Sequence, residues 1–152
     1  MHYLWYSLRT LLGLILRRPI LGTCIIPILP NGMLVLVRRR DSGLWGLPGG
    51  IIDWNEDIWT AARREVYEET GLTIVGLERL VGIYSHPDRD PRFHSVCVTV
   101  AAQVTGIPIV KDVKEIVEVK EFPLEQLPQE TLSHDHSRQL KDYMEKVDPV
   151  LS

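Results

Sequence analysis

The sequence predicts an α/β fold in which helices cover both faces of a β-sheet. Two observations predict it: several runs rich in aliphatic and β-branched residues, and two amphipathic segments, at 58–70 and 133–147, that lie between and after them. Strands flanked by two helices are typical of a sheet covered on both sides. With 152 residues the chain is the size of one domain, long enough to bury roughly two-thirds of its unfolded surface.

The first two runs predict a β-hairpin. Residues 22–29 and 33–39 are separated by Pro30, Asn31 and Gly32, which are turn-forming residues. Because such residues between two β-rich runs reverse the chain, we expect the runs to pair as antiparallel strands. Further strands are expected at 73–84 (one or two strands), 94–104 and 118–122, with a turn or single helical turn at 123–128.

The segment at 58–70 predicts a helix with recognisable ends. Asp57 can cap its first turn, and apolar residues recur along it at helical spacing. Gly71 can end it, since glycine adopts left-handed backbone angles without strain. Asn55, which tolerates the same angles, lies where the chain turns into the helix.

This helix carries three glutamates on one face. Glu65 and Glu69 are one turn apart, and Glu68 lies beside them. Their like charges repel, at a cost of a few tenths of a kcal/mol per pair. A hard divalent cation reverses that sign, because carboxylate oxygens are the ligands that Mg2+ or Mn2+ prefers. The face is therefore predicted to bind metal; the alternative is a solvated acidic surface.

The loop before the helix favours close approach to a ligand. Residues 45–50 join Trp45, an apolar anchor, to a rigid proline and two permissive glycines. Backbone carbonyls and amides of such a loop can come near a ligand that a Cβ atom would obstruct.

Residues 50–72 resemble the Nudix box at every defining position. The matching residues are Gly50, Glu56, Arg64, Glu65, Glu68, Glu69 and Gly71, with Val66 and Leu72 at the two apolar positions. The resemblance begins at Arg38 and extends more loosely to about Tyr143. It implies a Nudix-type α/β/α sandwich with a mixed β-sheet between helices, formed by residues 21–152.

The resemblance also implies an activity. Nudix proteins hydrolyse a nucleoside diphosphate linked to another moiety, cutting a pyrophosphate bond with divalent metal. By analogy the ligands of Mg2+ or Mn2+ are Glu65, Glu68, Glu69 and the carbonyl of Gly49. Arg64 would hold the acids in place by a salt bridge, and Glu56 would brace the loop or bind metal through water.

One carboxylate must take the proton from the attacking water. Glu65 is a candidate, but relatives often supply this base from a distant loop. Glu115 and Glu118, just before the strand-like residues 119–122, are the candidates there. The alternative for both is an ordinary charged strand edge.

The stretch 84–94 resembles a loop of ADP-ribose pyrophosphatases. Its arginines can fork onto phosphate oxygens, and its aromatic rings can stack on a base. The alternative is a surface turn with Asp–Arg pairs. The candidate substrate contacts are Tyr84, Arg89, Arg92, Phe93 and, from the end of the predicted hairpin, Arg39.

The last helix is expected from Ser133, as its N-cap, through about Val147. His134 and His136 flank Asp135 at its start. We expect these to be solvated helix-start residues, with ligand or substrate contacts as the alternative.

Residues 1–20 predict an apolar helix outside the hydrolase domain. The stretch is short and interrupted by Arg9, so it is not expected to span a bilayer, and it lacks the features of a secretory signal. Packing on the domain, or on a second copy in a homodimer, is preferred. A membrane-surface helix is the alternative, because Arg17 and Arg18 follow a Trp-bearing apolar face.

Composition agrees with a small enzyme of the cytoplasm. The formal net charge of −3 gives no support for nucleic-acid binding. Cys24 and Cys97 lie in apolar, strand-like stretches, which predicts buried thiols and favours a reducing compartment. The expected partner is a small-molecule nucleotide.

Three functions remain open at this point. Hydrolysis of ADP-ribose to AMP and ribose 5-phosphate is favoured by the 84–94 loop. A nucleoside triphosphate pyrophosphatase is an alternative, because the box does not encode the leaving group. A non-catalytic module that senses ADP-ribose is the other, although the intact glutamates argue against it.

Overall fold

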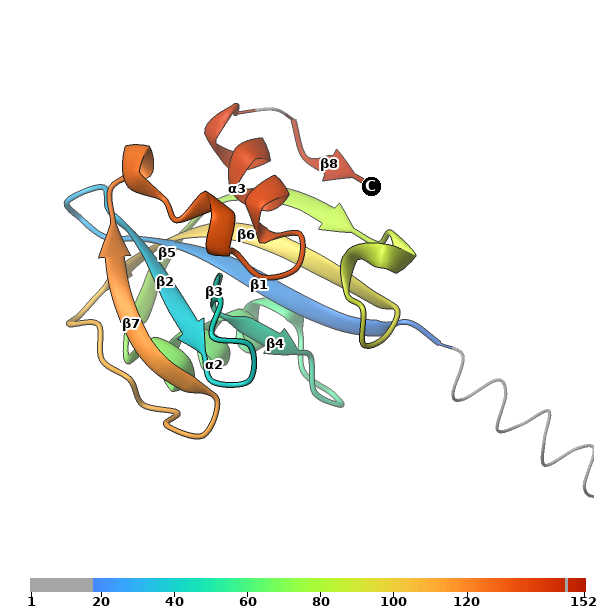
Figure 1. Cartoon of the computed structure of the whole chain (residues 1–152), viewed down its shortest axis with the longest axis horizontal. Coiled ribbons are helices and arrows are strands. Elements are labelled where there is room, and N and C mark those ends of the chain that lie inside the picture. The colour runs from blue at the N-terminus through green and yellow to red at the C-terminus, as the bar shows by residue number, and fades with distance from the viewer. Residues whose placement is uncertain (1–17, 147) are drawn as a thin grey trace, which may run out of the picture.

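The computed structural model describes residues 18–146 and 148–152 of the chain. The predicted N-terminal helix therefore lies almost wholly outside the described residues, and strand β1 already begins at Ile20. Within the described ranges, helices α2 and α3 lie on opposite faces of one mixed sheet (Figure 1). Neither of these two helices is long and apolar enough to cross a membrane.

Eight strands of the described chain form the sheet. They are β1 (Ile20–Ile28), β2 (Leu34–Arg39), β3 (Trp45–Gly46), β4 (Gly49–Ile51), β5 (Thr73–Tyr84), β6 (Ser95–Thr105), β7 (Ile116–Phe122) and β8 (Val150–Leu151). The helices are α2 (Ile58–Thr70) and α3 (His136–Met144), with short 3-10 helices at Pro87–Arg89, Leu124–Gln126 and Gln129–Thr131.

The sheet is mixed, as predicted. Its order is β3-β2-β1-β6-β5-β8, with β4 paired to β1 and β7 paired to β2. Strand β1 is antiparallel to β2 and parallel to β6, while β5 is antiparallel to β6 and parallel to β8. The predicted hairpin is confirmed by the pairing of Ile28 with Leu34 across the turn.

Alternate residues of the central strands supply two separate cores. Cys24 and Ile26 of β1 join the core that contains Leu140 of α3. Ile25, between them, joins the core that contains Val66 of α2. Because successive side chains of a strand point to opposite faces, this alternation covers both sides of the sheet with apolar contacts.

Helix α2 has the limits that its sequence predicted. The Asp57 carboxylate accepts hydrogen bonds from the backbone N–H groups of Trp59 and Thr60, both at 2.9 Å. Gly71 ends the helix at φ 72°, and Asn55 has φ 63° in the turn that leads into it. The acidic face of α2 is therefore presented from a helix with both ends fixed.

The start of α3 differs from the prediction. The helix begins at His136 rather than after Ser133, because His134 adopts left-handed angles at φ 52° that interrupt a helix. Ser133 is buried, and its backbone N–H donates to the carbonyl of Trp45 at 2.7 Å. It therefore anchors the chain to β3 instead of capping α3.

The predicted burial of both cysteines is confirmed. Cys24 on β1 and Cys97 on β6 are free thiols, and both are buried.

Candidate active site

An open cavity of about 500 Å3 lies where β1, the loop before α2 and the loop between β5 and β6 meet. Its lining contains both carboxylates and cationic groups. The acidic members are Asp53, Glu65, Glu68, Glu69, Asp90, Asp112 and Glu115, the cationic members are Arg39, Arg64, Arg89 and Arg92, and the imidazoles of His134 and His136 also line the cavity. Such a lining can hold a cation on its carboxylates and an anion on its arginines.

The carboxylate of Glu69, in the last turn of α2, is buried. Its side chain is almost wholly out of solvent, with 4% exposed, and its Oε2 accepts a hydrogen bond from the Gly49 N–H at 3.0 Å. Burial raises the pKa of Glu69 to about 8, a shift that the hydrogen bond from Gly49 opposes and the nearby charge of Glu65 supports. Burial also raises the pKa of Glu65, although Arg64 opposes that shift.

Arg64 forms hydrogen-bonded ion pairs with both Glu56 and Glu65. Its Nε and Nη2 donate to the two carboxylate oxygens of Glu56 at 2.9 and 2.8 Å, and its Nη1 donates to Glu65 at 2.7 Å. The hydrogen bonds from Arg64 lower the pKa of Glu56 to about 2, so Glu56 is ionised throughout the neutral range. A bidentate pair of this kind fixes the orientation of both partners.

Two glycines let the loop approach these carboxylates closely. A Cβ atom on Gly50 would clash with the carboxylate of Glu65, and one on Gly49 would clash with the backbone of Thr23. Gly49 also has φ 154°, which side-chain-bearing residues rarely adopt. The lack of a side chain at Gly49 lets the loop pack on the backbone of β1, and at Gly50 it leaves room for the Glu65 carboxylate in its present position.

The chemistry of the donor set fits a hard divalent cation. In the part of the chain that the structure describes, no three His, Cys, Asp or Glu side chains are gathered closely enough to hold a metal as they stand. Glu65, Glu68 and Glu69 nevertheless share one helix face beside the cavity, and Glu68 is half exposed. Glu69 is buried and Glu65 partly buried, both have a raised pKa, and a cation would offset the cost of ionising them.

Comparison with known proteins identifies this arrangement. The NUDIX domain family matches residues 18–143, which is most of the chain. The chain belongs to the Nudix family. Its acidic helix and glycine loop are accordingly the Nudix box, and the protein is a Nudix pyrophosphohydrolase, as the resemblance in its sequence implied.

The Nudix relatives differ in their names. An ADP-ribose pyrophosphatase of Methanocaldococcus jannaschii is 38% identical over 117 residues, which cover 75% of this chain and 67% of the relative. A putative 8-oxo-dGTP diphosphatase of Bacillus subtilis is 39% identical over 66 residues, covering 43% of this chain and 44% of the relative. The crystal structure of a MutT NUDIX hydrolase from Burkholderia pseudomallei has a TM-score of 0.72 at 30% identity, covering 82% of this chain and 98% of that one.

Four of the five predicted substrate contacts, Arg39, Arg89, Arg92 and Phe93, line the Nudix cavity. Arg39 pairs with Asp41 at 3.1 Å, so its guanidinium is partly engaged. Arg92 pairs with Asp90 at 2.9 Å and lies 5.2 Å from the ring centroid of Phe93, which is partly exposed. Arg39, Arg92 and Phe93 line the cavity with groups that can contact a nucleotide.

The predicted roles of Tyr84 and Glu118 require correction. Tyr84 is 1% exposed and its hydroxyl donates to Asp142 on α3 at 2.9 Å, so neither ring face is free to stack on a base. Glu118 lies inside β7 rather than before it, because that strand begins at Ile116. Its carboxylate pairs with Arg38 at 3.0 Å and lies outside the cavity lining, whereas Glu115 lines the cavity.

The structure also corrects the predictions for Arg89 and for the start of α3. Arg89 lines the cavity, but its guanidinium is buried in a two-bond ion pair with Asp135 at 3.1 and 2.9 Å and also bonds Ser95. It therefore has little freedom to fork onto phosphate. His136 is 6% exposed, so it is not the solvated helix-start residue that was expected, whereas His134 is exposed, as predicted, and also lines the cavity.

Sequence reasoning missed Asp112 in the cavity lining. Its carboxylate accepts from the backbone N–H of Lys114 at 2.9 Å and shapes the turn that carries Glu115. Arg40 holds the same turn, since its guanidinium donates to the Val113 carbonyl and its backbone N–H donates to the Glu115 carbonyl at 2.7 Å. The contacts of Asp112 are local, but no local pattern shows that this turn reaches the cavity, because the residue that holds it there, Arg40, is 73 residues from Val113 in the chain.

Proposed function

We propose that this Nudix hydrolase cleaves ADP-ribose into AMP and ribose 5-phosphate, with Mg2+ or Mn2+ bound by Glu65, Glu68, Glu69 and the Gly49 carbonyl. The observation that carries the proposal is one cavity that combines the acidic face of α2 with arginines from the hairpin and from the β5–β6 loop. The M. jannaschii relative, named an ADP-ribose pyrophosphatase, supports the choice of substrate.

Substrate binding falls to the arginines of the cavity rim. Arg39 and Arg92 each hold one aspartate through two hydrogen bonds, but both are more exposed than Arg89, and their remaining N–H groups can donate to phosphate oxygens. The exposed face of Phe93 offers an apolar contact for the base or a ribose ring. Arg89 remains paired with Asp135 and shapes the wall behind the diphosphate.

Hydrolysis requires a charge-neutralising group, a nucleophile and a base. Glu65, Glu68, Glu69 and the Gly49 carbonyl would hold a divalent cation, which would supply charge to screen the phosphate oxygens and would lower the pKa of a bound water. Arg64 keeps Glu56 and Glu65 oriented toward that position. Glu115 accepts the proton from water, because Glu65 already accepts a hydrogen bond from Arg64 and Glu118 is paired with Arg38.

Assays of separate candidate substrates test the proposal. Purified protein is incubated with Mg2+ or Mn2+ and either ADP-ribose, other nucleoside diphosphate derivatives or nucleoside triphosphates, and the products are separated by ion-exchange chromatography. We expect AMP from ADP-ribose, and no release after chelation with EDTA. Preference for a triphosphate with release of diphosphate would favour the alternative that the B. subtilis relative suggests. Binding of ADP-ribose without turnover of any compound would favour a sensing module.

Partners and location stay predictions. The buried free thiols Cys24 and Cys97 fit a reducing cytoplasm. Deleting residues 1–18 and measuring both oligomer mass and association with liposomes separates domain or dimer packing from membrane-surface contact.

A further inference from the structure

The segment before α3 is docked on the loop that leads into the Nudix box. Leu132 forms a bridge with Trp45, and the Ser133 N–H donates to the Trp45 carbonyl at 2.7 Å. His136 Nδ1 accepts a hydrogen bond from the Leu47 N–H at 3.0 Å. These contacts join two parts of the chain about 90 residues apart.

His136 is suited to this contact as a fixed acceptor. Its imidazole is buried, and burial lowers its pKa to about 3, so the ring is neutral throughout the working range. Because Nδ1 accepts from Leu47, the ring proton resides on Nε2, which lies 3.6 Å from Cys24 Sγ. Both ring nitrogens therefore have a partner, and the ring orientation is determined.

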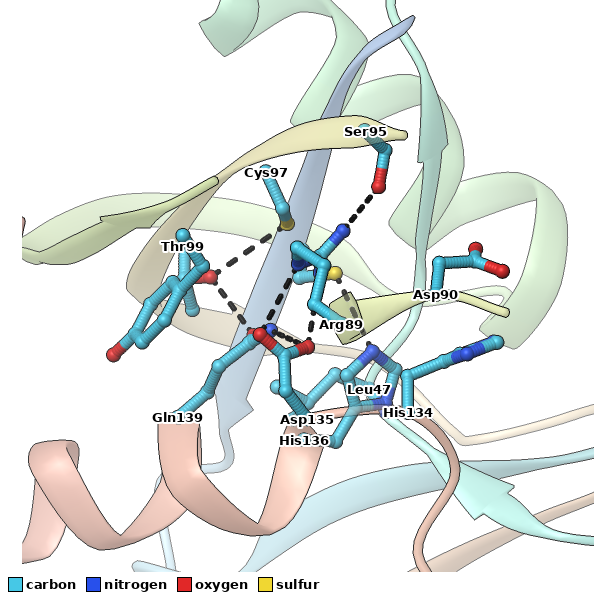
Figure 2. A network of polar contacts seen from close by, with 12 residues as sticks. Leu47, Arg89, Asp90, Ser95, Cys97, Thr99, His134, Asp135, His136 and Gln139 are labelled. Atoms are coloured by element: carbon cyan, nitrogen blue, oxygen red, sulfur yellow. Dashed lines mark hydrogen bonds and ion pairs between the residues drawn. The ribbon is translucent and has the colours of Figure 1, made fainter. Parts of the chain in front are cut away.

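A buried polar network holds the end of α3 that carries this histidine (Figure 2). Asp135 accepts from Arg89 through both carboxylate oxygens and from Gln139 Nε2 at 2.8 Å. Gln139 Oε1 in turn accepts from Thr99 Oγ1 of β6 at 2.8 Å. The first turn of α3 is thus bonded to β6 and to the β5–β6 loop, and it cannot shift without breaking these bonds.

The two residues after Leu47 link it to β1 and to the acidic helix. The Pro48 carbonyl accepts from the Ile25 N–H at 2.9 Å, and the Gly49 N–H donates to Glu69 at 3.0 Å. Three consecutive residues are therefore bonded to three different elements: α3, β1 and α2. The fit is close, because a Cβ atom on Gly46 would lie 2.8 Å from Ser133 Oγ and 2.9 Å from His136 Nδ1.

We propose that His136 is a positioning residue of the active site, which holds Leu47 through Nδ1 and so places Gly49 and Glu69 for cation binding. The inference rests on the metal-dependent function proposed above. It assigns His136 no contact with substrate, and it predicts that the acceptor atom matters rather than the imidazole ring.

Two substitutions at one position separate the acceptor from the ring. In His136→Asn the amide oxygen can occupy the place of Nδ1, whereas in His136→Gln the polar group lies near the place of Nε2. We expect His136→Gln to weaken Mn2+ binding about tenfold, as loss of a supporting hydrogen bond around a metal site commonly does. His136→Asn should retain most of the affinity. Mn2+ binding is measured by electron paramagnetic resonance of the free ion, without substrate.

Amide hydrogen exchange reports the loop independently of metal. The Leu47 N–H should exchange faster in metal-free His136→Gln than in the wild type or in His136→Asn. A second pair of variants leaves the histidine in place: Gly46→Ala should weaken Mn2+ binding, whereas Gly76→Ala should not, since a Cβ there meets only Gln103 Oε1 at 3.7 Å.

The outcomes distinguish the two proposals. Failure of the wild type to bind Mn2+ would overturn the proposed metal-dependent function, and with it the placement of a cation by His136. Wild-type binding together with equal Mn2+ affinity and unchanged Leu47 exchange in His136→Gln would overturn the positioning role alone. Should His136→Gln fail to fold, as judged by circular dichroism, equal affinities of the two glycine variants would overturn it.

Discussion

Glu69→Gln should stabilise the metal-free protein at high pH and leave it nearly unchanged at low pH. The carboxylate has an ordinary pKa of 4.5 when the chain is unfolded and about 8 in the fold, where it is buried. Between these two values the native state retains a proton that the unfolded state has lost. Stability then falls as pH rises, by about 1.4 kcal/mol per pH unit.

Over the whole interval between these two pKa values, the free energy of unfolding falls by at most about 5 kcal/mol, and this full loss is reached near pH 8. Glutamine resembles the protonated acid and has no such dependence, so the two unfolding free energies should agree near pH 4.5 and diverge above it. The assay is urea denaturation in EDTA across pH 4.5 to 8.5. Glu68→Gln is the matched control, because its side chain is half exposed on the same helix face. Parallel pH curves for Glu69→Gln and the wild type would refute the reasoning.

Three further changes test the site and the core. Glu68→Gln should lower kcat by orders of magnitude while the circular dichroism spectrum is unchanged, because it removes a proposed metal ligand. Glu115→Gln should lower kcat by at least about 100-fold, as loss of a general base does, whereas Glu118→Gln, outside the cavity, should stay near the wild-type rate. Leu140→Ala should cost about 2–5 kcal/mol of unfolding free energy in urea, since this side chain is fully buried between α3 and the sheet.

Features that depend on neighbours in the chain could be predicted from the sequence. Asp57 and Gly71 fix the ends of α2 through bonds and angles within a few residues. The hairpin follows for the same reason, because its turn residues and its alternating strands are adjacent. The acidic face of α2 belongs to this class, since residues three and four apart on a helix always share a face.

Features that depend on distant partners could not be predicted. His136 and Asp135 resemble solvated helix-start residues in the sequence, yet their partners Leu47 and Arg89 come from other elements, and His136 is buried and Asp135 partly buried. Tyr84 resembles a stacking residue at a loop entrance, but α3 covers it and supplies Asp142 for its hydroxyl. In each case the missing information is which element packs on the residue, and no local pattern contains it.

Burial of Glu69 explains why the loop beside the acidic face of α2 is held by several hydrogen bonds. A buried carboxylate is costly unless it is protonated, hydrogen-bonded or paired with a cation. The Gly49 N–H provides one bond, but the pKa of about 8 indicates that one bond leaves most of the cost in place. A cation that displaces the proton would therefore gain a ligand already oriented by the loop. The same loop is held in turn by β1 and by His136, so the fold would orient the groups of the proposed cation site before a cation binds.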